Sequence, residues 1–460
     1  MIACHGAWVT DINSPSPAPS PYPDTPSHPF RVHNFRCYWL SRLAMTLAGY
    51  AMMLIIGWQT YNIARDGGMS IAEASGQLAL IGLLQFLPLF VLTPFSGLAA
   101  DRFDRRKLAR LTVFLQLLCA GALAFATWSE RIDLPILYTI AVVLGVVRGF
   151  AGPALSALAP NLVPKAILPT AIALSSIAWQ VGMIGGPALG GYLYAIEPAL
   201  PYAVATGLFV ISMIALTLIG QVPQPAARKD RRPIGAIIDG ARYVVHNKMV
   251  LGAITLDLFA VFLAGATALF PIYARDILQV GETGLSQLAM APAVGAAITA
   301  AWFSFRPIST NVGPKMLWAV AVFGLATIVF GLSTSMPLSL AMLFVIGAAD
   351  MFSVYIRQSL IQLHTPDDKR GRVSSVSLLT ISASNEGGDA FSGSLAYLIG
   401  PVAAVVAGGV GAIVTVMVWA RIFPVLRTTK TFDPPDDLLD TSSNAQQNQA
   451  KDAQQAQKES

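Results

Sequence analysis

Charged side chains are scarce in this sequence. Lysine, arginine, aspartate and glutamate together make up 12% of the 460 residues, against about 25% in an average soluble domain. So few charges cannot cover the surface of a soluble protein of this length. Apolar residues, at 54%, can cover a surface that faces lipid. The composition therefore excludes an ordinary soluble protein and predicts one that lies largely within a membrane.

Several chemical signatures are also missing. The three cysteines, Cys4, Cys37 and Cys119, do not have the spacing of a disulfide framework or a zinc site. The sequence contains no GxxxxGK[ST] loop, HExxH pair or GxSxG turn. It therefore predicts neither an ATPase motor nor an enzyme, and it predicts no cofactor and no metal.

Long apolar runs occur throughout the chain. A helix that crosses a bilayer needs about 20 mostly apolar residues, and some runs, such as 168–194, contain no charged residue at all. We predict an all-α membrane protein with membrane-spanning helices near 37–63, 76–98, 108–128, 134–158, 168–194, 202–220, 250–274, 285–305, 315–334, 338–363, 373–398 and 401–423.

Positive charge is distributed unevenly among the predicted loops. Those after the even-numbered helices contain 17 lysines and arginines, and those after the odd-numbered helices contain 3. Because loops rich in lysine and arginine stay on the cytosolic side, the even-numbered loops and both termini are predicted to be cytosolic, with the chain in a bacterial inner (plasma) membrane. The same distribution explains the formal net charge of +5 without nucleic acid as a partner.

One long polar connection divides the predicted helices into two equal sets. Residues 221–249 form a basic cytosolic linker between a six-helix bundle at 37–220 and another at 250–423. Two equal sets of this kind are typical of secondary transporters built from a duplicated unit. The proline-rich segment 1–36, which lacks the pattern of a signal peptide, and the polar segment 424–460 are predicted to be disordered cytosolic tails.

The loop after the second predicted helix carries a recognisable motif, Gly97-Leu98-Ala99-Ala100-Asp101-Arg102-Phe103-Asp104-Arg105-Arg106. It resembles the G-x-x-x-D-R-x-G-R-R signature of the major facilitator superfamily and matches it at Gly97, Asp101, Arg102, Arg105 and Arg106. Asp104 replaces the second glycine, and because aspartate tolerates a left-handed backbone better than most residues, we expect the turn to be preserved.

This resemblance implies the major facilitator fold, with two pseudo-symmetric bundles of six helices. It also implies a conformational latch, in which the Asp101 carboxylate faces the positive N-terminal end of the eleventh helix near Gly371. The alternative interpretation is a plain cluster of positive charge, which does not require the Asp-Arg spacing.

The fifth predicted helix carries a second motif. Its sequence resembles the G-x-x-x-G-P-x-x-G-G motif of proton-coupled exporters in the same superfamily, and the matching residues are Gly182, Gly186, Pro187, Gly190 and Gly191. Glycines four residues apart allow close contact between helices, and the proline removes one backbone hydrogen bond. The resemblance implies efflux rather than uptake. Simple helix packing is the alternative interpretation.

The second half of the sequence is similar to one branch of the superfamily. The segments 256–259, 347–358 and 384–388 resemble those of the branch that contains enterobactin-exporter-like and drug-efflux permeases. The resemblance extends over about residues 36–423. It supports the branch and does not identify a substrate.

A few charged residues lie inside the predicted helices. An intramembrane charge is costly and usually faces the protein interior, so these residues are candidates for coupling protons to substrate movement. A fixed structural ion pair is the alternative role. The candidates are Arg148, which also matches the R-x-x-x-G motif of the superfamily with Gly152, and Asp257, Asp350, Arg357, Glu386 and Asp389.

Spacing suggests how these candidates pair. Asp350 and Arg357 are seven residues apart and therefore share a helix face, so we expect them to form an ion pair. Glu386 then has no obvious partner unless Arg148 or Arg42 reaches it across a central cavity. An unpaired carboxylate near the bilayer midplane binds and releases protons readily, which favours Glu386 slightly over Asp350 as the proton-handling group.

These patterns predict a permease that works by alternating access. It exports a small molecule, such as a siderophore, drug or metabolite, in exchange for an inward proton. Its partners are the substrate, protons and lipid, and the superfamily suggests a monomer. Two alternatives stay open: a proton-coupled uptake symporter on the same fold, and a transport-inactive membrane receptor or scaffold.

Overall fold

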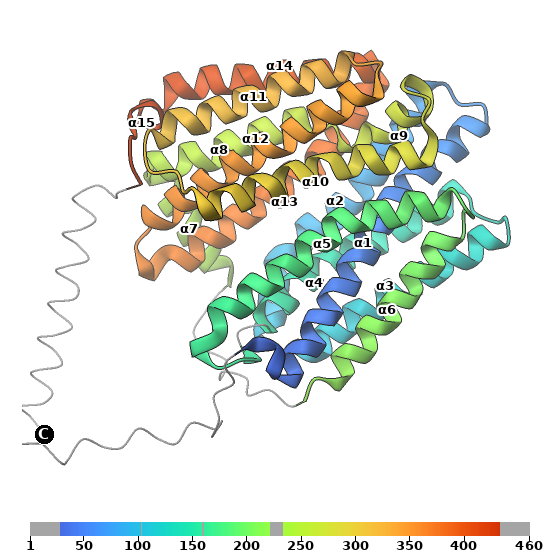
Figure 1. The fold of residues 1–460 in the computed structure, drawn as a ribbon, viewed down its shortest axis with the longest axis horizontal. Helices are drawn as coiled ribbons and strands as arrows, with labels where there is room; N and C mark the ends of the chain where they lie inside the picture. Colours follow the sequence, from blue (N-terminus) through green and yellow to red (C-terminus); the bar gives the residue numbers. More distant parts are fainter. Residues whose placement is uncertain (1–27, 103, 159–160, 221–232, 433–460) are drawn as a thin grey trace, which may run out of the picture.

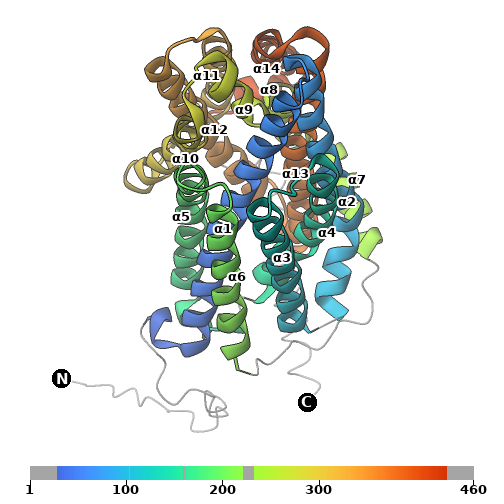
Figure 2. The ribbon, with the colours of Figure 1, turned by 90° about the vertical axis from the view of Figure 1, so that its right-hand side faces the viewer.

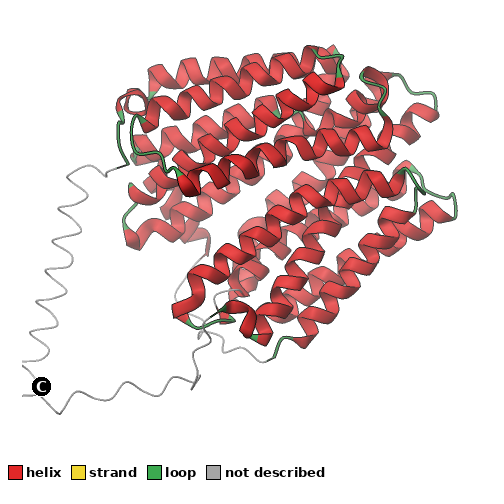
Figure 3. Cartoon of the chain, in the orientation of Figure 1, coloured by secondary structure: helices red, strands yellow, loops and turns green. Residues whose placement is uncertain are grey.

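The described part of the molecule is built from α-helices. The computed structural model describes residues 28–102, 104–158, 161–220 and 233–432, and these ranges contain no β-strand (Figure 3). Within them, eleven helices are long and apolar enough to cross a membrane. The predicted eleventh span corresponds to α13 (Asp367–Ile399), which is long enough but falls short in apolar character, because charged and hydroxyl side chains interrupt its sequence.

The first six long helices form one bundle, here called the N bundle. In this bundle α1 packs against α5 and α6, α2 packs against α4, and α3 packs against α4 and α6. Large apolar and aromatic side chains such as Tyr38, Ile55 and Phe209 are almost completely buried between them. The bounds are α1 (His33–Asp66), α2 (Ile71–Arg102), α3 (Arg105–Trp128), α4 (Leu134–Leu158), α5 (Leu168–Tyr194) and α6 (Leu200–Leu218).

The second set of helices forms the C bundle. Here α10 packs against α12, α11 packs against α12 and α14, and α8 packs against α13 and α14. Its helices are α8 (Lys248–Ala264), α9 (Phe270–Ile272), α10 (Gly281–Phe305), α11 (Val312–Leu332), α12 (Met336–Leu363), α13 and α14 (Pro401–Ile422), with the short α15 (Pro424–Thr428) after them.

The seventh predicted span is interrupted, which corrects the expectation of one continuous helix at 250–274. α8 ends at Ala264, and Gly265 has an extended backbone. A 3-10 turn (Thr267–Leu269), the single turn of α9 and a π-helical turn, η5 (Tyr273–Ile277), then continue in the same direction. The interruption follows from Gly265, which favours no regular helix, and from Pro271, which cannot donate a backbone hydrogen bond.

The two bundles lie side by side and contact each other along two helix pairs. α2 packs along α13, and α5 packs along α10 (Figures 1 and 2). Successive helices run in opposite directions, so α1 begins and α6 ends at the same end of the molecule, here called the linker end. α1 ends and α2 begins at the opposite end, here called the far end.

Two ordered segments lie in regions predicted to be linker and tail. The amphipathic helix α7 (Pro233–His246) packs against α8 and α13, and Asp239 on it lies 3.5 Å from Arg372 of α13. After α14, the chain forms α15, and the carbonyl of Thr429 accepts a hydrogen bond from the N–H of Gly313 at 3.1 Å. The predicted N-terminal tail 1–36 also has an ordered end, since it contains a 3-10 turn (Pro29–Arg31) and the first turn of α1, which corrects the expectation of disorder there. Residues 1–27 and 433–460 lie outside the described residues.

Candidate functional site

An arginine and a glutamate join the two bundles. Arg148 of α4 and Glu386 of α13 form an ion pair, with Nη2 to Oε1 at 2.6 Å and Nη1 to Oε2 at 3.4 Å. Nη1 of Arg148 also lies 3.3 Å from Oε1 of Gln85 on α2. The arrangement is bidentate, the geometry in which a guanidinium holds a carboxylate best.

Close packing of α2 and α4 places Arg148 beside Gln85. Gly145, one turn before Arg148, lies so close to the backbone of Gln85 that a Cβ atom at this position would collide with it. The side chain of Arg148 is 35% exposed and that of Glu386 is 12% exposed. The Arg148–Glu386 ion pair is therefore only partly buried. Its two side chains join the N bundle to the C bundle.

A second arginine pair is buried inside the C bundle. Arg357 of α12 pairs with Asp257 of α8, and their side chains are only 4% and 8% exposed. The expected pairing of Arg357 with Asp350 is therefore wrong. Sharing a helix face allowed it, but α8 packs against α12 and supplies a carboxylate from the side, which spacing along one helix cannot reveal.

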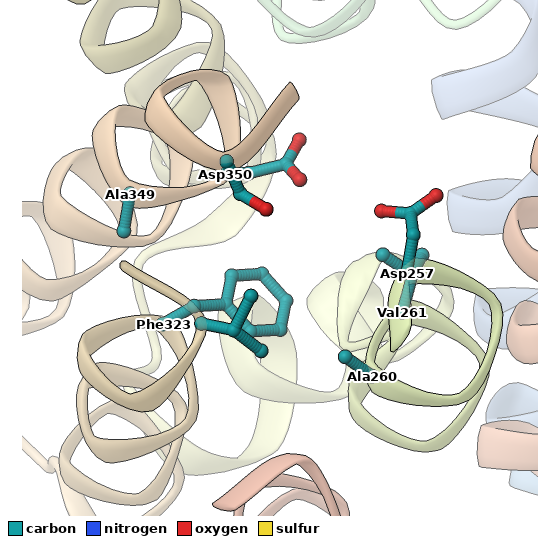
Figure 4. Close-up of a pocket in the computed structure, with 8 residues that line it drawn as sticks. Asp257, Ala260, Val261, Phe323, Ala349 and Asp350 are labelled. Carbon is teal, nitrogen blue, oxygen red and sulfur yellow. The ribbon is translucent and has the colours of Figure 1, made fainter. Parts of the chain in front are cut away.

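Asp350 faces the same buried region without a bond of its own. Within the part of the chain that the structure describes, it has no ion pair or hydrogen bond. The carboxylates of Asp257 and Asp350 point toward one another across a small cavity (Figure 4), which Ser353 and Phe323 also line. The cavity has room for about one water molecule.

Asp389 stabilises the interruption in the seventh span. Its Oδ1 accepts hydrogen bonds from the hydroxyl of Thr267 at 2.6 Å and from the backbone N–H of Ala268 at 3.3 Å. These donors begin the 3-10 turn after Gly265, so Asp389 acts as a side-chain cap from the neighbouring helix α13. Asp389 lies three residues after Glu386, which places both carboxylates on one side of α13.

At the far end a cluster of polar side chains links α1 to η5. Arg65 pairs with Asp276 at 3.1 Å, and Arg275 pairs with Asp66 at 2.6 Å. Tyr61 donates to Asp276 at 2.5 Å, and Arg275 also donates to the side chain of Asn62 at 2.5 Å. The two ion pairs are reciprocal, since each bundle contributes one Arg-Asp dipeptide.

This far-end cluster was not predicted from the sequence. Arg65 and Arg275 are two of the three positive charges in the loops after odd-numbered helices. The signal that could have found the cluster is the repeated Arg-Asp dipeptide at the far-end termini of the first and seventh spans, because opposite charges in matching positions of two bundles can pair reciprocally.

The loop motif between α2 and α3 is only partly described. Gly97, Asp101 and Arg102 lie in the last turns of α2, and their side chains are outside the described part of the structure. The proposed latch from Asp101 to α13 therefore stays a prediction.

Asp104 behaves differently from the expected left-handed turn residue. Its φ angle is −59°, and its carboxylate caps α3 by accepting from the N–H of Arg106 at 2.9 Å. Burial alone would raise the pKa of Asp104, but this hydrogen bond and the positive charge of Arg106 outweigh burial and lower the pKa below its ordinary value.

Arg106, from the same motif, also holds the end of α6. Its Nη1 donates to the carbonyl of Gly220 at 2.6 Å, and Arg110, one turn later, donates to the carbonyl of Leu216 at 3.0 Å. These bonds satisfy carbonyls at the C-terminal end of α6 that have no partner within the helix.

The glycine motif of the fifth span packs against both bundles. A Cβ atom on Gly186 would lie 2.6 Å from Cβ of Tyr50 on α1, so only glycine allows this approach. Gly182 and Gly190 also face α1, whereas Gly191 faces Ser286 of α10 in the C bundle. The buried Pro187 lies inside α5. Nothing in this packing distinguishes efflux from the simple packing role.

Similarity to known proteins agrees with this architecture. Residues 37–385 match the Major Facilitator Superfamily. The multidrug efflux pump Tap of Mycobacterium tuberculosis is 26% identical over 347 residues, which cover 73% of this chain and 78% of Tap. The enterobactin exporter EntS of Escherichia coli is 25% identical over 420 residues, which cover 89% of this chain and 95% of EntS.

Solved structures of similar fold cover most of the chain. A bacterial homologue of the human lysosomal transporter Spinster superposes with a TM-score of 0.64 at 16% identity and covers 88% of this chain and 100% of its own. A POT family transporter in complex with 5-aminolevulinic acid has a TM-score of 0.66 at 14% identity and covers 86% of this chain and 96% of its own. With two six-helix bundles and a family match over most of its length, the chain belongs to the major facilitator superfamily.

Proposed function

We propose that this transporter exports a small organic molecule from the cytosol by alternating access, in exchange for an inward proton. The observation that carries the proposal is the Arg148–Glu386 pair, which joins the bundles midway along their helices. A bond between two bodies that rock against each other has different energies in the two states, and only such differential contacts can bias a conformational equilibrium. In this structure the far-end cluster holds the outer ends of α1 and η5 together.

Two observations support export rather than uptake. The α5 motif resembles that of proton-coupled exporters, and both relatives described above are named for efflux. In this proposal the substrate enters from the linker end, which faces the cytosol. The far-end cluster must then break before release on the other side.

A proton-binding group is available in the C bundle. Asp350 has no counter-charge of its own, since Arg357 is bonded to Asp257, and an ionised carboxylate without a partner is costly in a low-dielectric interior. Asp350 therefore takes up a proton readily. In this proposal it replaces Glu386 as the first proton-handling candidate, because Glu386 is already paired with Arg148.

Inside-out membrane vesicles provide the direct test. Vesicles acidified inside by respiration are monitored with a dye whose fluorescence is quenched by the pH gradient, and ethidium or enterobactin is then added. Export by proton exchange predicts recovery of fluorescence and uptake of the compound into the vesicle. A protonophore must abolish the uptake, and vesicles without the protein are the control. Uptake that survives collapse of the gradient would refute proton coupling.

Orientation is tested independently with reporter fusions. The proposal expects fusions at Asp133 or Pro198, in far-end loops, to be periplasmic, and fusions at Arg231 or Asp367 to be cytosolic. A reversed pattern would exchange the two sides, so that the far end, and not the linker end, would face the cytosol, which would contradict the proposed entry of substrate from the linker end.

A further inference from the structure

Arg42 is an interior charge of the N bundle that the proposed cycle does not use. It lies on α1, where its Nη1 donates to the hydroxyl of Tyr38 at 3.2 Å. Among the described residues no carboxylate pairs with Arg42, and its buried Nε has no hydrogen-bond partner. An unpaired guanidinium within a membrane span is costly. Such a cost is offset if an anion from outside the chain binds there.

One aromatic ring lies beside this guanidinium, and a second ring packs against the first. Its central carbon lies 5.8 Å from the centroid of the Trp179 ring on α5, and the Tyr50 ring lies 6.5 Å from the same ring. Trp179 is 42% exposed despite its position within the bundle. A half-exposed indole beside a cation offers a flat apolar surface on which a planar group can stack.

The side of α1 that carries Arg42 borders open space. Gly49, seven residues later and so on nearly the same face, is exposed, and a Cβ atom built there would meet no other atom within 4 Å. Arg42 and Arg148 lie at similar depths, each about 15 Å from the linker-end terminus of its helix. Both arginines are therefore within reach of the space between the bundles.

The charges around this region do not neutralise Arg42. Glu386 neutralises Arg148, and Asp389, one turn closer to the far end, has its carboxylate bonded to Thr267 and Ala268. Among the described residues around Trp179, Arg42 therefore keeps a positive charge that no carboxylate neutralises.

We infer that Arg42, together with Trp179 and Tyr50, forms the binding site for an organic anion with an aromatic ring, in which the guanidinium holds the anionic group and the indole stacks on the ring. This inference rests on the proposed function and narrows its substrate class. It selects against compounds whose charged group is cationic, because such a group would be brought next to Arg42 without a counter-charge.

Two dyes that share one ring system test this inference. Fluorescein is an anionic xanthene, and rhodamine 123 is a cationic one. Equilibrium binding of each dye to the purified full-length protein is measured by fluorescence anisotropy. We expect fluorescein to bind more tightly, and Arg42→Gln to weaken its binding by at least about tenfold, because a charge-assisted hydrogen bond is lost. Arg42→Lys should keep most of the affinity.

Arg36→Gln is the matched control, since it removes the same charge from an exposed position of the same helix. It should leave the affinity for fluorescein unchanged. The inference is overturned if rhodamine 123 binds as tightly as fluorescein, if neither dye binds, or if Arg42→Gln has no effect. Proton exchange driven by rhodamine 123 alone in inside-out vesicles would also overturn it, while leaving the proposed export function standing.

Discussion

Two of the arginine–carboxylate pairs use the same chemistry in different places. Arg357 and Asp257 both belong to the C bundle and are almost fully buried, at 4% and 8% exposure. Arg148 and Glu386 belong to different bundles, and Arg148 is 35% exposed. In the proposed cycle the bundles rock against each other, so the first pair can persist and the second must stretch or break. We therefore expect the pair inside one bundle to stabilise the fold and the pair between the bundles to affect which state is occupied.

The largest expected effect comes from breaking the buried pair. Arg357→Met leaves the Asp257 carboxylate buried without a partner, a change that typically costs about 3 to 5 kcal/mol. We expect a large loss of folded protein, measured as a fall in the thermal unfolding temperature in detergent. The double variant Arg357→Met/Asp257→Leu should recover most of that temperature, because it removes both partners and leaves neither of them buried alone. Equal loss in the single and double variants would contradict a purely pairwise role.

For the Arg148–Glu386 pair between the bundles we expect a large effect on the rate of transport and a small effect on stability. Arg148→Gln removes charge-assisted hydrogen bonds worth about 1.5 to 3 kcal/mol in favourable cases, and partial exposure of Arg148 reduces that value. We expect at least about tenfold slower substrate uptake in inside-out vesicles, with a much smaller fall in unfolding temperature than for Arg357→Met.

The charge-swapped variant Arg148→Glu/Glu386→Arg controls for loss of charge and should regain part of the transport. If Arg148→Gln instead unfolds as readily as Arg357→Met while the folded fraction transports normally, the distinction between the two pairs is lost.

The ion pairs of the far-end cluster also join the two bundles, and breaking one of them should have a smaller effect than breaking the Arg148–Glu386 pair. Asp276→Asn weakens bonds to Arg65 and Tyr61, and partly exposed ion pairs contribute up to about 1 kcal/mol, or about fivefold in an equilibrium. A cysteine introduced at Gly49, in protein whose native cysteines are replaced by serine, should then be labelled severalfold faster by a membrane-impermeant reagent added from the far-end side. Asp66→Asn should have a smaller effect, because Asp66 is 69% exposed. Labelling that both changes leave untouched would show that this end does not open.

The helices were predictable from the sequence because every predicted span except α13 carries its own signal of length and apolar character. The superfamily was predictable as well, since the spacing of Gly97, Asp101 and Arg102 is a local property. The interruption after Ala264 was not, because the decisive partner, Asp389, comes from another helix. The partner of Arg357 was predicted wrongly, and that of Glu386 was left open, for the same reason: a pairing between helices depends on which faces pack together, and spacing along one helix does not contain that information.

The smallest expected effect concerns Asp104, which lies between two spans instead of within one. Its lowered pKa means that the ionised form is favoured in the folded protein. The stability this contributes is complete above the ordinary carboxylate pKa of about 4 and is lost as the pH falls through the lower pKa of the folded state.

Asp104→Asn keeps a capping side chain but removes the charge that faces Arg106, 3.6 Å away. The variant should therefore unfold at a slightly lower temperature than wild type at pH 6, by the equivalent of up to about 1 kcal/mol, and the gap should narrow as the pH falls below about 4. Asp104→Ala loses the cap as well, so part of its gap should remain at low pH. The measurement is the unfolding temperature of wild type, Asp104→Asn and Asp104→Ala across this pH range. If the gap between wild type and Asp104→Asn does not depend on pH, the charge of Asp104 contributes nothing to stability.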